Sequence, residues 1–194
     1  MKTLLTLDQL KRAMPRLKRE PDEAESYIEP LNVVLNDFEI NTPVRIACFL
    51  AQIAHESGEL RFWEEIWGPT KQQKKYDPPH GLAERLGNTH VGDGRRYKGR
   101  GPIQLTGRAN YRRVGEKLDL ELEDDPGLVA KPRYGFQVAG LFWSENGCNE
   151  LADATAKGGL EAFSRLTRRI NGGLTGLDDR VKRWQLAKQV FNLV

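Results

Sequence analysis

The sequence predicts a mainly α-helical domain that carries one irregular lobe after a central buried helix. Apolar residues recur at helical spacing before residue 57 and again after residue 102. Between these parts the periodicity fades, and glycine, proline and other turn residues take over. No alternation of strand and helix patterns indicates a parallel sheet. We therefore expect a single domain over residues 1–194, with the lobe at about residues 58–101 containing a small β element and forming one wall of a cleft.

The first helices are predicted by their start signals. Thr6-Leu-Asp-Gln9 has the pattern of a capping box, in which a hydroxyl and a side chain three residues later satisfy free backbone N–H groups. Pro21 is a residue that opens helices. Apolar residues between Tyr27 and Phe38 recur at helical spacing, and Pro30 predicts a kink or break there.

The central helix is the most apolar segment of the chain. Thr42 and Pro43 supply its N-cap and first turn, and the helix is predicted to continue to Glu56. Gly58 ends it. Because apolar residues cover most of its circumference, we expect this helix to be buried.

Helical periodicity returns after Pro102. Four further helices are predicted, over Ile103–Leu118, Tyr134–Asn146, Leu160–Ile170 and Leu177–Val194.

Composition excludes several classes of protein. The chain has 39% hydrophobic and 29% charged residues and a net charge of +3, which is ordinary for a globular domain. This mild basic balance suits an anionic polymer, but there is no dense basic stripe of the kind that binds nucleic acid. No apolar run reaches membrane-spanning length. Cys48 and Cys148 stand beside apolar residues, so we expect two buried free thiols rather than a disulfide scaffold.

The first ten residues resemble a signal peptide only briefly. Asp8 and Lys11 interrupt the pattern before an apolar core forms. We therefore expect the protein to be made in the cytoplasm and to need help to reach a target outside the inner membrane.

Glu56 is the first candidate catalytic residue. It is placed at the C-terminal end of an apolar helix, beside the negative end of the helix dipole. This is the environment expected of a group that donates a proton to a glycosidic oxygen. Glycoside hydrolysis also needs a second carboxylate.

Glu64 and Glu65 are the candidates for that second carboxylate. In an unbroken helix Glu65 would point away from Glu56 and lie about 13 Å along the axis, too far to share a substrate. A chain that folds back after Gly58 removes this conflict. The residues alone leave the choice between Glu64 and Glu65 open. Glu59 is expected to be a solvated surface charge.

The histidines do not predict a metal site. His55, beside Glu56, is expected to hold the local backbone rather than to act as a base or a metal ligand. His80 and His90 lie in loops without further ligands at close spacing. We expect no metal and no cofactor.

Four motifs, in order along the chain, resemble family 19 glycoside hydrolases. They span roughly Val44 to Trp184, and the second is the most specific. They are His55-Glu56-Ser57-Gly58; Tyr97-Lys-Gly-Arg-Gly-Pro-Ile-Gln-Leu-Thr106; Asp125-Pro-Gly-Leu-Val-Ala130 followed by Phe142-Trp143; and Ile170-Asn-Gly-Gly173 followed by Asp179-Arg180. Short loops and the opening Leu-Asp-Gln-Leu-Lys-Arg-Ala-Met-Pro resemble the phage and prophage endolysins of the family rather than its plant chitinases.

The resemblance implies a lysozyme-like α-rich fold with a cleft and an inverting mechanism. It makes Glu56 the general acid and Glu65 the general base, and Thr106 would hold the attacking water. A hydroxyl can donate to one neighbour and accept from another, which suits that task.

Further residues of these motifs are candidates for binding sugar. Gln104, Asn110 and Asn171 pair donors with acceptors, as sugar hydroxyls and N-acetyl groups require. Arg180 either pairs with an acid and tunes the site or staples the last helix. Tyr97, like Trp67, either stacks on sugar or belongs to a small core of the lobe.

Two basic residues of the Tyr97–Thr106 motif have candidate roles of their own. Arg100 either binds substrate or braces its loop. Lys98 replaces a tyrosine of the family pattern and is expected to favour an anionic glycan.

We expect a peptidoglycan hydrolase that cuts the β-1,4 link between N-acetylmuramic acid and N-acetylglucosamine. Its partner would be bacterial peptidoglycan, reached after release through a holin, with no nucleic acid, no stable membrane insertion and a monomeric state. The rivals are a chitinase with the same machinery, a non-catalytic wall-binding module and a lytic transglycosylase.

Overall fold

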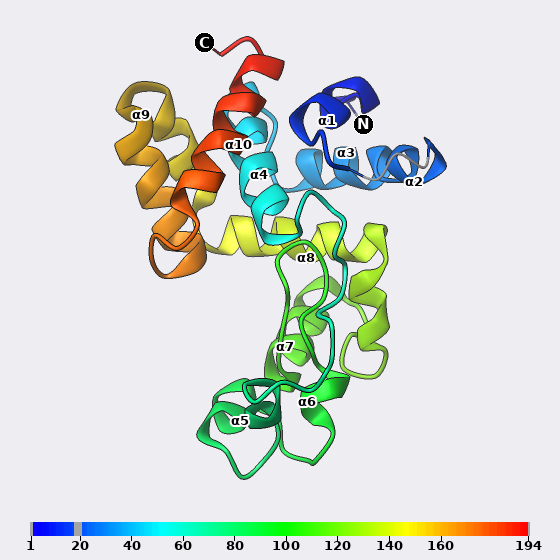
Figure 1. Ribbon diagram of the computed structural model, residues 1–194. Coiled ribbons are helices and arrows are strands. Elements are labelled where there is room, and N and C mark those ends of the chain that lie inside the picture. The colour runs from blue at the N-terminus through cyan, green and yellow to red at the C-terminus, as the bar shows by residue number, and fades with distance from the viewer. Residues whose placement is uncertain (1, 18–20, 194) are drawn as a thin grey trace. The chain divides into compact units, whose positions relative to one another are not determined.

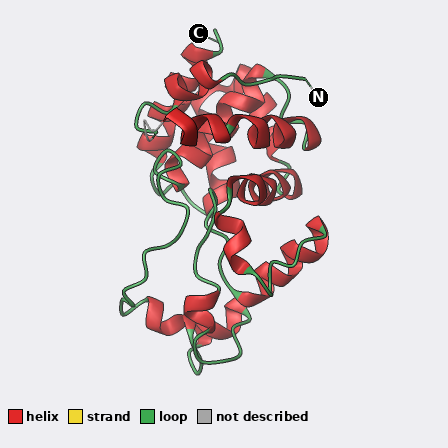
Figure 2. Ribbon diagram, turned by 90° about the vertical axis from the view of Figure 1, so that its right-hand side faces the viewer, coloured by secondary structure: helices red, strands yellow, loops and turns green. Residues whose placement is uncertain are grey.

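The computed structural model describes residues 2–17 and 21–193 and is mainly helical (Figures 1 and 2). This confirms the predicted fold class. The α-helices are α1 (Leu7–Ala13), α2 (Pro21–Ser26), α3 (Ile28–Asp37), α4 (Pro43–Glu56), α5 (Gly81–Leu86), α6 (Asp93–Arg96), α7 (Arg108–Leu118), α8 (Pro132–Glu145), α9 (Cys148–Asn171) and α10 (Leu177–Val190). Two short 3₁₀ helices are η1 (Gln73–Tyr76) and η2 (Pro126–Ala130).

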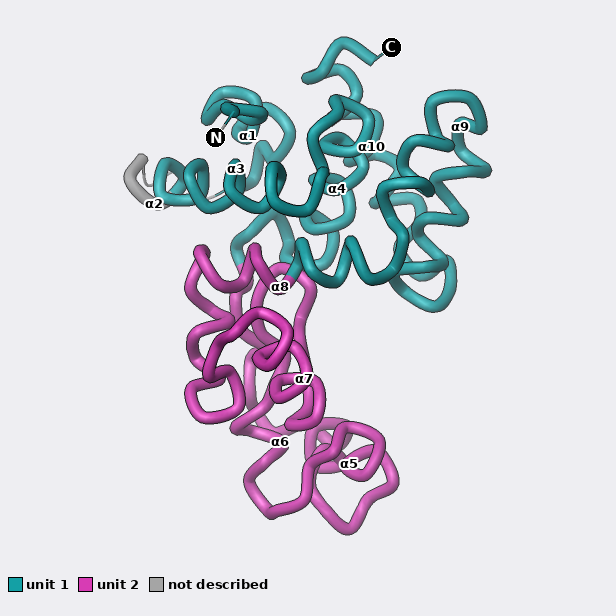
Figure 3. Tube along the Cα trace, turned by 180° about the vertical axis from the view of Figure 1, so that it is seen from behind, with its two compact units in different colours: residues 1–61, 139–194 teal, residues 62–138 magenta. Residues whose placement is uncertain are grey.

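The chain forms two compact units (Figure 3). Unit 1 comprises residues 1–61 and 139–194, and unit 2 comprises residues 62–138. The division falls inside α8. The organisation as one catalytic domain stays a prediction.

Helix α4 is the centre of unit 1, as the sequence predicts. It packs against α9 and α10 (Figure 1). Every residue from Ile46 to Ala54 is buried. Phe49 in α4 meets the ring of Trp143 edge to face, with 5.3 Å between ring centroids. Such dense apolar packing fixes the position of the C-terminal end of α4.

The predicted starts of α1, α2 and α4 are confirmed. Thr6 and Gln9 form a capping box at the start of α1. The Thr42 hydroxyl accepts a hydrogen bond from Arg45 N at the start of α4, where Pro43 is the first residue. Pro30 lies in the first turn of α3, where a missing N–H costs nothing.

Unit 2 is irregular, and its β element is minimal. Arg100 forms antiparallel bridges with Glu64 on one side and with Leu105 on the other. Backbone hydrogen bonds join Glu65 N to Gly99 O at 2.8 Å and Gly101 N to Trp63 O at 2.9 Å. Three short extended segments thus lie side by side. The loop-rich part that precedes Arg100 contains η1, α5 and α6, which the sequence analysis did not predict.

All four helices predicted after Pro102 have different bounds in the structure, and α8 begins two residues before and ends one residue before the predicted Tyr134–Asn146. The helix expected from Ile103 begins at Arg108, because Gln104 and Gly107 take left-handed backbone conformations, with φ of 55° and 92°. The helix expected from Leu160 is the second half of α9, which starts at Cys148 and kinks at Gly159. The last helix ends at Val190.

The two cysteines are buried free thiols, as predicted. Burial raises the pKa of both Cys48 and Cys148 to about 12. Within the part of the chain that the structure describes, no helix is long and apolar enough to span a bilayer.

Candidate active site

Glu56 is the last residue of α4 and is held by a buried arginine. Arg180 of α10, whose side chain is 2% exposed, donates from Nη2 to Glu56 Oε1. Its Nη1 donates to Gln52 Oε1, and Gln52 Nε2 donates to Thr167 Oγ1 of α9 at 3.1 Å. A chain of polar contacts therefore runs from α9 through α4 and α10 to the Glu56 carboxylate.

The surroundings of Glu56 differ from the apolar pocket expected. Its side chain is 26% exposed and ion-paired. Both roles weighed for Arg180 are present, because it pairs with an acid and also joins α10 to α4 through Gln52. Its Nε is buried and has no hydrogen-bond partner among the described residues.

Asp179 and Arg183 of α10 form a second set of contacts beside the Glu56–Arg180 pair. Asp179 Oδ2 lies 2.6 Å from His55 Nδ1 and 2.6 Å from Arg183 Nε. Arg183 Nη1 lies 2.6 Å from Glu59 Oε1. The end of α4 and the turn after it are thus joined to α10 by the ion pairs Glu56–Arg180 and Glu59–Arg183 and by the His55–Asp179 hydrogen bond, which together we call the charge ladder.

The ladder corrects one expectation and agrees with another. Glu59 is not a surface charge, because its side chain is 5% exposed and paired with Arg183. His55 holds structure, as expected: its ring also packs against the backbone of Gly176, where a Cβ would come within 2.4 Å of it. Burial alone would raise the pKa of Asp179, but hydrogen bonds from Arg183 and His55 outweigh it and lower that pKa.

The turn after α4 is strained and is held by hydrogen bonds to Glu59 and from Leu60. Gly58, Glu59 and Leu60 all have left-handed backbones, with φ of 59°, 65° and 60°. Two of the three are not glycine, and such residues pay a steric penalty. Glu59 Oε2 accepts from Arg16 N at 2.5 Å, and Leu60 N donates to Ser57 Oγ at 2.7 Å. These bonds fix the direction in which the chain leaves Glu56.

Glu65, in unit 2, is held by neutral donors. Its Oε1 accepts from Gln73 Nε2 at 2.9 Å, and its Oε2 accepts from Gly99 N at 3.0 Å. The carboxylate is half-buried. A carboxylate can accept about four hydrogen bonds, so two such donors orient it and leave it able to accept a proton from water.

Two other predicted site residues lie close to Gly99, which donates to Glu65. A Cβ on Gly99 would lie 2.7 Å from Gln104 Oε1 and 3.3 Å from Thr106 Oγ1. The Thr106 hydroxyl donates to Gln104 O at 2.8 Å. Asn110 follows on α7 and donates to Thr106 O at 2.8 Å. Unit 2 therefore brings Glu65, Gln104 and Thr106 together around Gly99, where a side chain would displace the Gln104 amide.

Glu64 faces a different set of partners. Lys98 Nζ lies 2.7 Å from Glu64 Oε2, and Arg100 Nε lies 3.1 Å from its Oε1. The hydrogen bond from Lys98, helped by Arg100, lowers the pKa of Glu64. Lys98 is thus ion-paired within the protein, and its predicted preference for an anionic glycan stays a prediction. Arg100 also donates to Arg96 O, so its role as a loop brace is confirmed.

Tyr97 corrects the expectation that it stacks on sugar. Its ring is 1% exposed, packs against Tyr111 at 5.5 Å and lies under Arg108. Its hydroxyl donates to Glu123 O at 3.2 Å. Tyr97 is therefore part of a small core. Trp67 is half-buried and tilted against another tyrosine, Tyr76, with 6.1 Å between ring centroids.

Asn171, the remaining predicted contact, is exposed at the last position of α9 in unit 1. Its Nδ2 donates to Thr175 O at 3.3 Å. It shares no hydrogen bond with Glu56 or Arg180 in the structure, and its role in binding sugar stays a prediction.

Two residues that hold acidic side chains near the site, Arg183 at Glu59 and Gln73 at Glu65, were not predicted from the sequence. Arg183 gave no signal, because its partner Glu59 is 124 residues away. Gln73 did have one. Thr70-Lys-Gln-Gln73 repeats the capping-box spacing recognised at Thr6.

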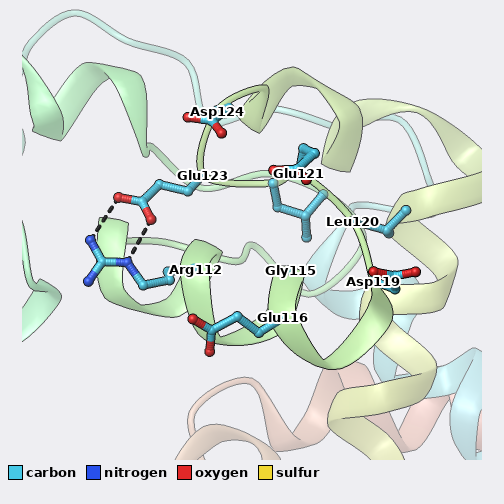
Figure 4. Close-up of a pocket in the computed structure, with 9 residues that line it drawn as sticks. Arg112, Gly115, Glu116, Asp119, Leu120, Glu121, Glu123 and Asp124 are labelled. Atoms are coloured by element: carbon cyan, nitrogen blue, oxygen red, sulfur yellow. Dashed lines mark hydrogen bonds and ion pairs between the residues drawn. The ribbon is translucent and has the colours of Figure 1, made fainter.

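The structure also shows a separate surface pocket of about 280 Å³ in unit 2 (Figure 4). Its lining comprises Arg112, Gly115, Glu116, Asp119, Leu120, Glu121, Leu122, Glu123 and Asp124. Arg112 and Glu123 form a two-point ion pair across it, at 2.6 and 2.8 Å. None of the predicted site residues lines it. Among the described residues, no group of three or more acids, histidines or cysteines is placed to hold a metal ion.

Comparison with known proteins gives the family. Residues 37–182 match the family of class I chitinases, glycoside hydrolase family 19. A glycosyl hydrolase family 19 domain-containing protein of Haemophilus influenzae is 36% identical over 164 residues, which cover 72% of this chain and 76% of that protein. An endochitinase of Arabidopsis thaliana, At2g43610, is 38% identical over 129 residues, but the match spans only 39% of its length.

Solved structures show the same fold. Chitinase C from Streptomyces griseus HUT6037 superposes with a TM-score of 0.71 at 20% identity, over 99% of this chain and 78% of that chain. A class IV chitinase of the same family from Zea mays gives a TM-score of 0.63, also at 20% identity, over 96% of this chain and 90% of that chain. This confirms the lysozyme-like α-rich fold. The chain belongs to glycoside hydrolase family 19 and is an enzyme that hydrolyses glycosidic bonds.

Proposed function

We propose that this enzyme is a peptidoglycan hydrolase of the endolysin type. It cleaves the β-1,4 bond between N-acetylmuramic acid and N-acetylglucosamine with inversion at the anomeric carbon. Glu56 is the general acid, Glu65 is the general base, and Thr106 helps to hold the attacking water.

Each step of this mechanism has a residue to perform it. Glu56 gives its proton to the glycosidic oxygen as the bond to the anomeric carbon breaks. Water attacks that carbon from the opposite face and gives a proton to Glu65. Such inversion requires about 6.5–9.5 Å between the two carboxyl groups, so that the water fits. Proton exchange with solvent then restores both groups.

The choice of Glu65 over Glu64 is supported by their partners. Glu64 is occupied by Lys98 and Arg100 at hydrogen-bond distance. Glu65 accepts from two neutral donors and adjoins the position where Thr106 Oγ1 and Gln104 Oε1 meet. A base that receives a proton from water must have an oxygen that is not already committed to a cation.

One observation carries the choice of peptidoglycan over chitin. Lys71, Lys74 and Lys75 surround Gln73, the residue that holds Glu65, and all three are exposed. They form no ion pair within the described part of the chain. Chitin is a neutral polymer, whereas peptidoglycan carries carboxylates. Unit 2 holds 14 Lys and Arg against 11 Asp and Glu, and so accounts for the whole net charge of +3.

Location and partners follow from this substrate. We propose that the enzyme acts as a monomer on the bacterial wall, reaches it from the cytoplasm through holes made by a holin, and binds neither nucleic acid nor the membrane interior.

A chitinase is the second candidate. The names of several relatives favour it, among them endochitinases of Arabidopsis thaliana and Gossypium hirsutum. The proposed acid, base and water would act in the same way on a polymer of N-acetylglucosamine alone.

Parallel assays separate the candidates. Purified peptidoglycan and colloidal chitin are digested side by side, and the soluble products are identified by mass spectrometry. The proposal predicts muropeptides with N-acetylmuramic acid at the reducing end and far slower release from chitin. Faster release of chitin oligomers establishes the chitinase, and anhydro-sugar products establish a lytic transglycosylase. A protein that pellets with walls but releases nothing is a binding module.

A further inference from the structure

Gln73 has every hydrogen-bonding group of its side chain occupied. The residue is 5% exposed, in η1 of unit 2. Its Oε1 accepts from Thr70 N at 2.8 Å and from Gly68 N at 3.2 Å. Its Nε2 donates to Glu65 Oε1 at 2.9 Å and to Ile66 O at 2.8 Å. The two ends of one amide therefore contact two different parts of the loop.

The oxygen end has a structural task. Gln73 N donates to Thr70 Oγ1 at 3.2 Å, while Thr70 N donates to Gln73 Oε1. This is a capping box, the same motif that Thr6 and Gln9 form at the start of α1. A glutamate performs this task as well as a glutamine, because the motif needs only an acceptor.

The nitrogen end has no part in the capping box. One of its two protons goes to Glu65 Oε1, and the other holds the backbone carbonyl of Ile66, the residue next to Glu65. Only an amide can supply both an acceptor to the capping box and donors to a carboxylate. In the first capping box Gln9 has no such partner for its nitrogen among the hydrogen bonds of the described residues.

We propose that Gln73 is a positioning residue for catalysis: it orients the Glu65 carboxylate through a hydrogen bond from Nε2. This rests on the proposed role of Glu65 as general base. The amide donates to the oxygen opposite the one that Gly99 N holds, so the two donors together fix the plane of the carboxylate. Lys74 and Lys75 follow it in η1, and the charge that they add faces solvent.

The variant Gln73→Glu separates the two ends of the side chain. It keeps an acceptor for Thr70 and Gly68 and removes the donors to Glu65 and to Ile66 O. It also sets two carboxylates about 3 Å apart, so that they share a proton as a coupled pair. We expect kcat at neutral pH to fall by about 10-fold or more with KM changed by less than about 3-fold. The acidic limb of the pH profile of kcat moves to higher pH.

Three companion variants control the experiment. Gln9→Glu makes the same change in the other capping box and leaves activity as in the parent. Gln72→Glu adds the same charge at the exposed neighbouring position and changes kcat by less than about 2-fold. The exchange variant Glu65→Gln/Gln73→Glu restores a donor and an acceptor between the two positions, but not the hydrogen bond to Ile66 O. It unfolds at a higher temperature than Gln73→Glu but is inactive.

The outcomes distinguish this inference from the proposed function. If Glu65→Gln keeps the parent rate, Glu65 is not the base and the proposed mechanism fails. If Glu65→Gln is inactive but Gln73→Glu has the parent's kcat and pH profile, the mechanism stands and Gln73 is only a cap. A loss in Gln73→Glu that is matched by a fall in unfolding temperature and leaves the pH profile unmoved also overturns the inference.

Discussion

The two candidate catalytic carboxylates are held by different kinds of contact. Glu56, in unit 1, is held by a buried arginine that belongs to the charge ladder between the end of α4 and α10. Glu65, in unit 2, is held by a side-chain amide and a backbone N–H on short irregular segments. One residue depends on charge, the other on neutral hydrogen bonds.

The difference shows how each unit can fix a reactive group. In unit 1 the contacts join residues about 124 positions apart, so the position of Glu56 depends on the packing of α4 against α10. In unit 2 the partners of Glu65 are 8 and 34 positions away. They lie on loops that lack a deep core, where neutral donors avoid the cost of burying an unbalanced charge.

The largest expected effect comes from removing either proton-transfer group. Glu56→Gln and Glu65→Gln should each lower kcat by about 10²–10⁴-fold, because each removes a general acid or base. Glu64→Gln should lower it by less than about 10-fold. Initial rates on one soluble substrate measure all three. A large loss in Glu64→Gln with normal activity in Glu65→Gln would move the base by one residue.

The charge ladder should matter for stability. Arg183→Met leaves Glu59 buried beside Arg16 N alone, and should lower the free energy of unfolding by about 3 kcal/mol. Glu59→Gln should cost less, because Arg183 keeps Asp179. Denaturant titrations of both single variants and the double variant measure the coupling. Additive effects would show that the two side chains do not interact.

Acid should weaken unit 2 through Asp93. Burial alone would raise the pKa of Asp93, but hydrogen bonds from Arg108 and from the backbone N–H groups of His90 and Thr89 lower it to about 2. A carboxyl group whose pKa is depressed on folding stabilises the fold above about pH 4, and this contribution of about 2 kcal/mol is lost as the pH falls towards 2. Asp93→Asn should flatten that part of the stability profile. Unfolding curves at several pH values would contradict this if parent and variant lost stability in parallel.

The smallest effect concerns the exposed lysines of unit 2. Replacing Lys71, Lys74 and Lys75 by glutamine should lower the rate on peptidoglycan by about 10-fold or less at low salt, with the difference vanishing as salt screens the charges. The rate on neutral chitin oligomers should stay unchanged. An equal loss on both substrates would mean that the lysines support the fold rather than choose the polymer.

Local sequence signals predicted the starts of α1 and α4 and the extent of the central helix correctly. The Thr6 capping box and the Thr42-Pro43 start need only neighbours in sequence. The burial of Glu59 was not predictable in this way, because its partner Arg183 lies on a distant helix. The start of α7 was misplaced because the left-handed backbones of Gln104 and Gly107 prevent a helix there. The apolar pattern of the sequence continues through these residues and gives no sign of this.

The candidate site was predictable in part. Glu56 and Arg180 came from motifs of the family and Glu65 from its spacing to Glu56, and the structure supplies a partner for each. The sequence alone did not show which of Glu64 and Glu65 faces the site. Successive side chains of an extended segment point to opposite sides, so only one of the two can do so. Only their partners distinguish them. The spacing of Thr70 and Gln73 could have predicted the capping hydrogen bond, but the contact of Gln73 with Glu65 depends on the path of the loop.

The stereochemistry of the first product tests the central claim most directly. Proton NMR, recorded within minutes of adding the enzyme to a soluble β-1,4-linked substrate, shows the anomeric configuration before mutarotation equalises it. Two carboxylates that act as acid and base on opposite faces of the sugar predict that the new reducing end is first the α-anomer. A first product in the β configuration would show retention, and would contradict the assignment of Glu65 as a base that activates water.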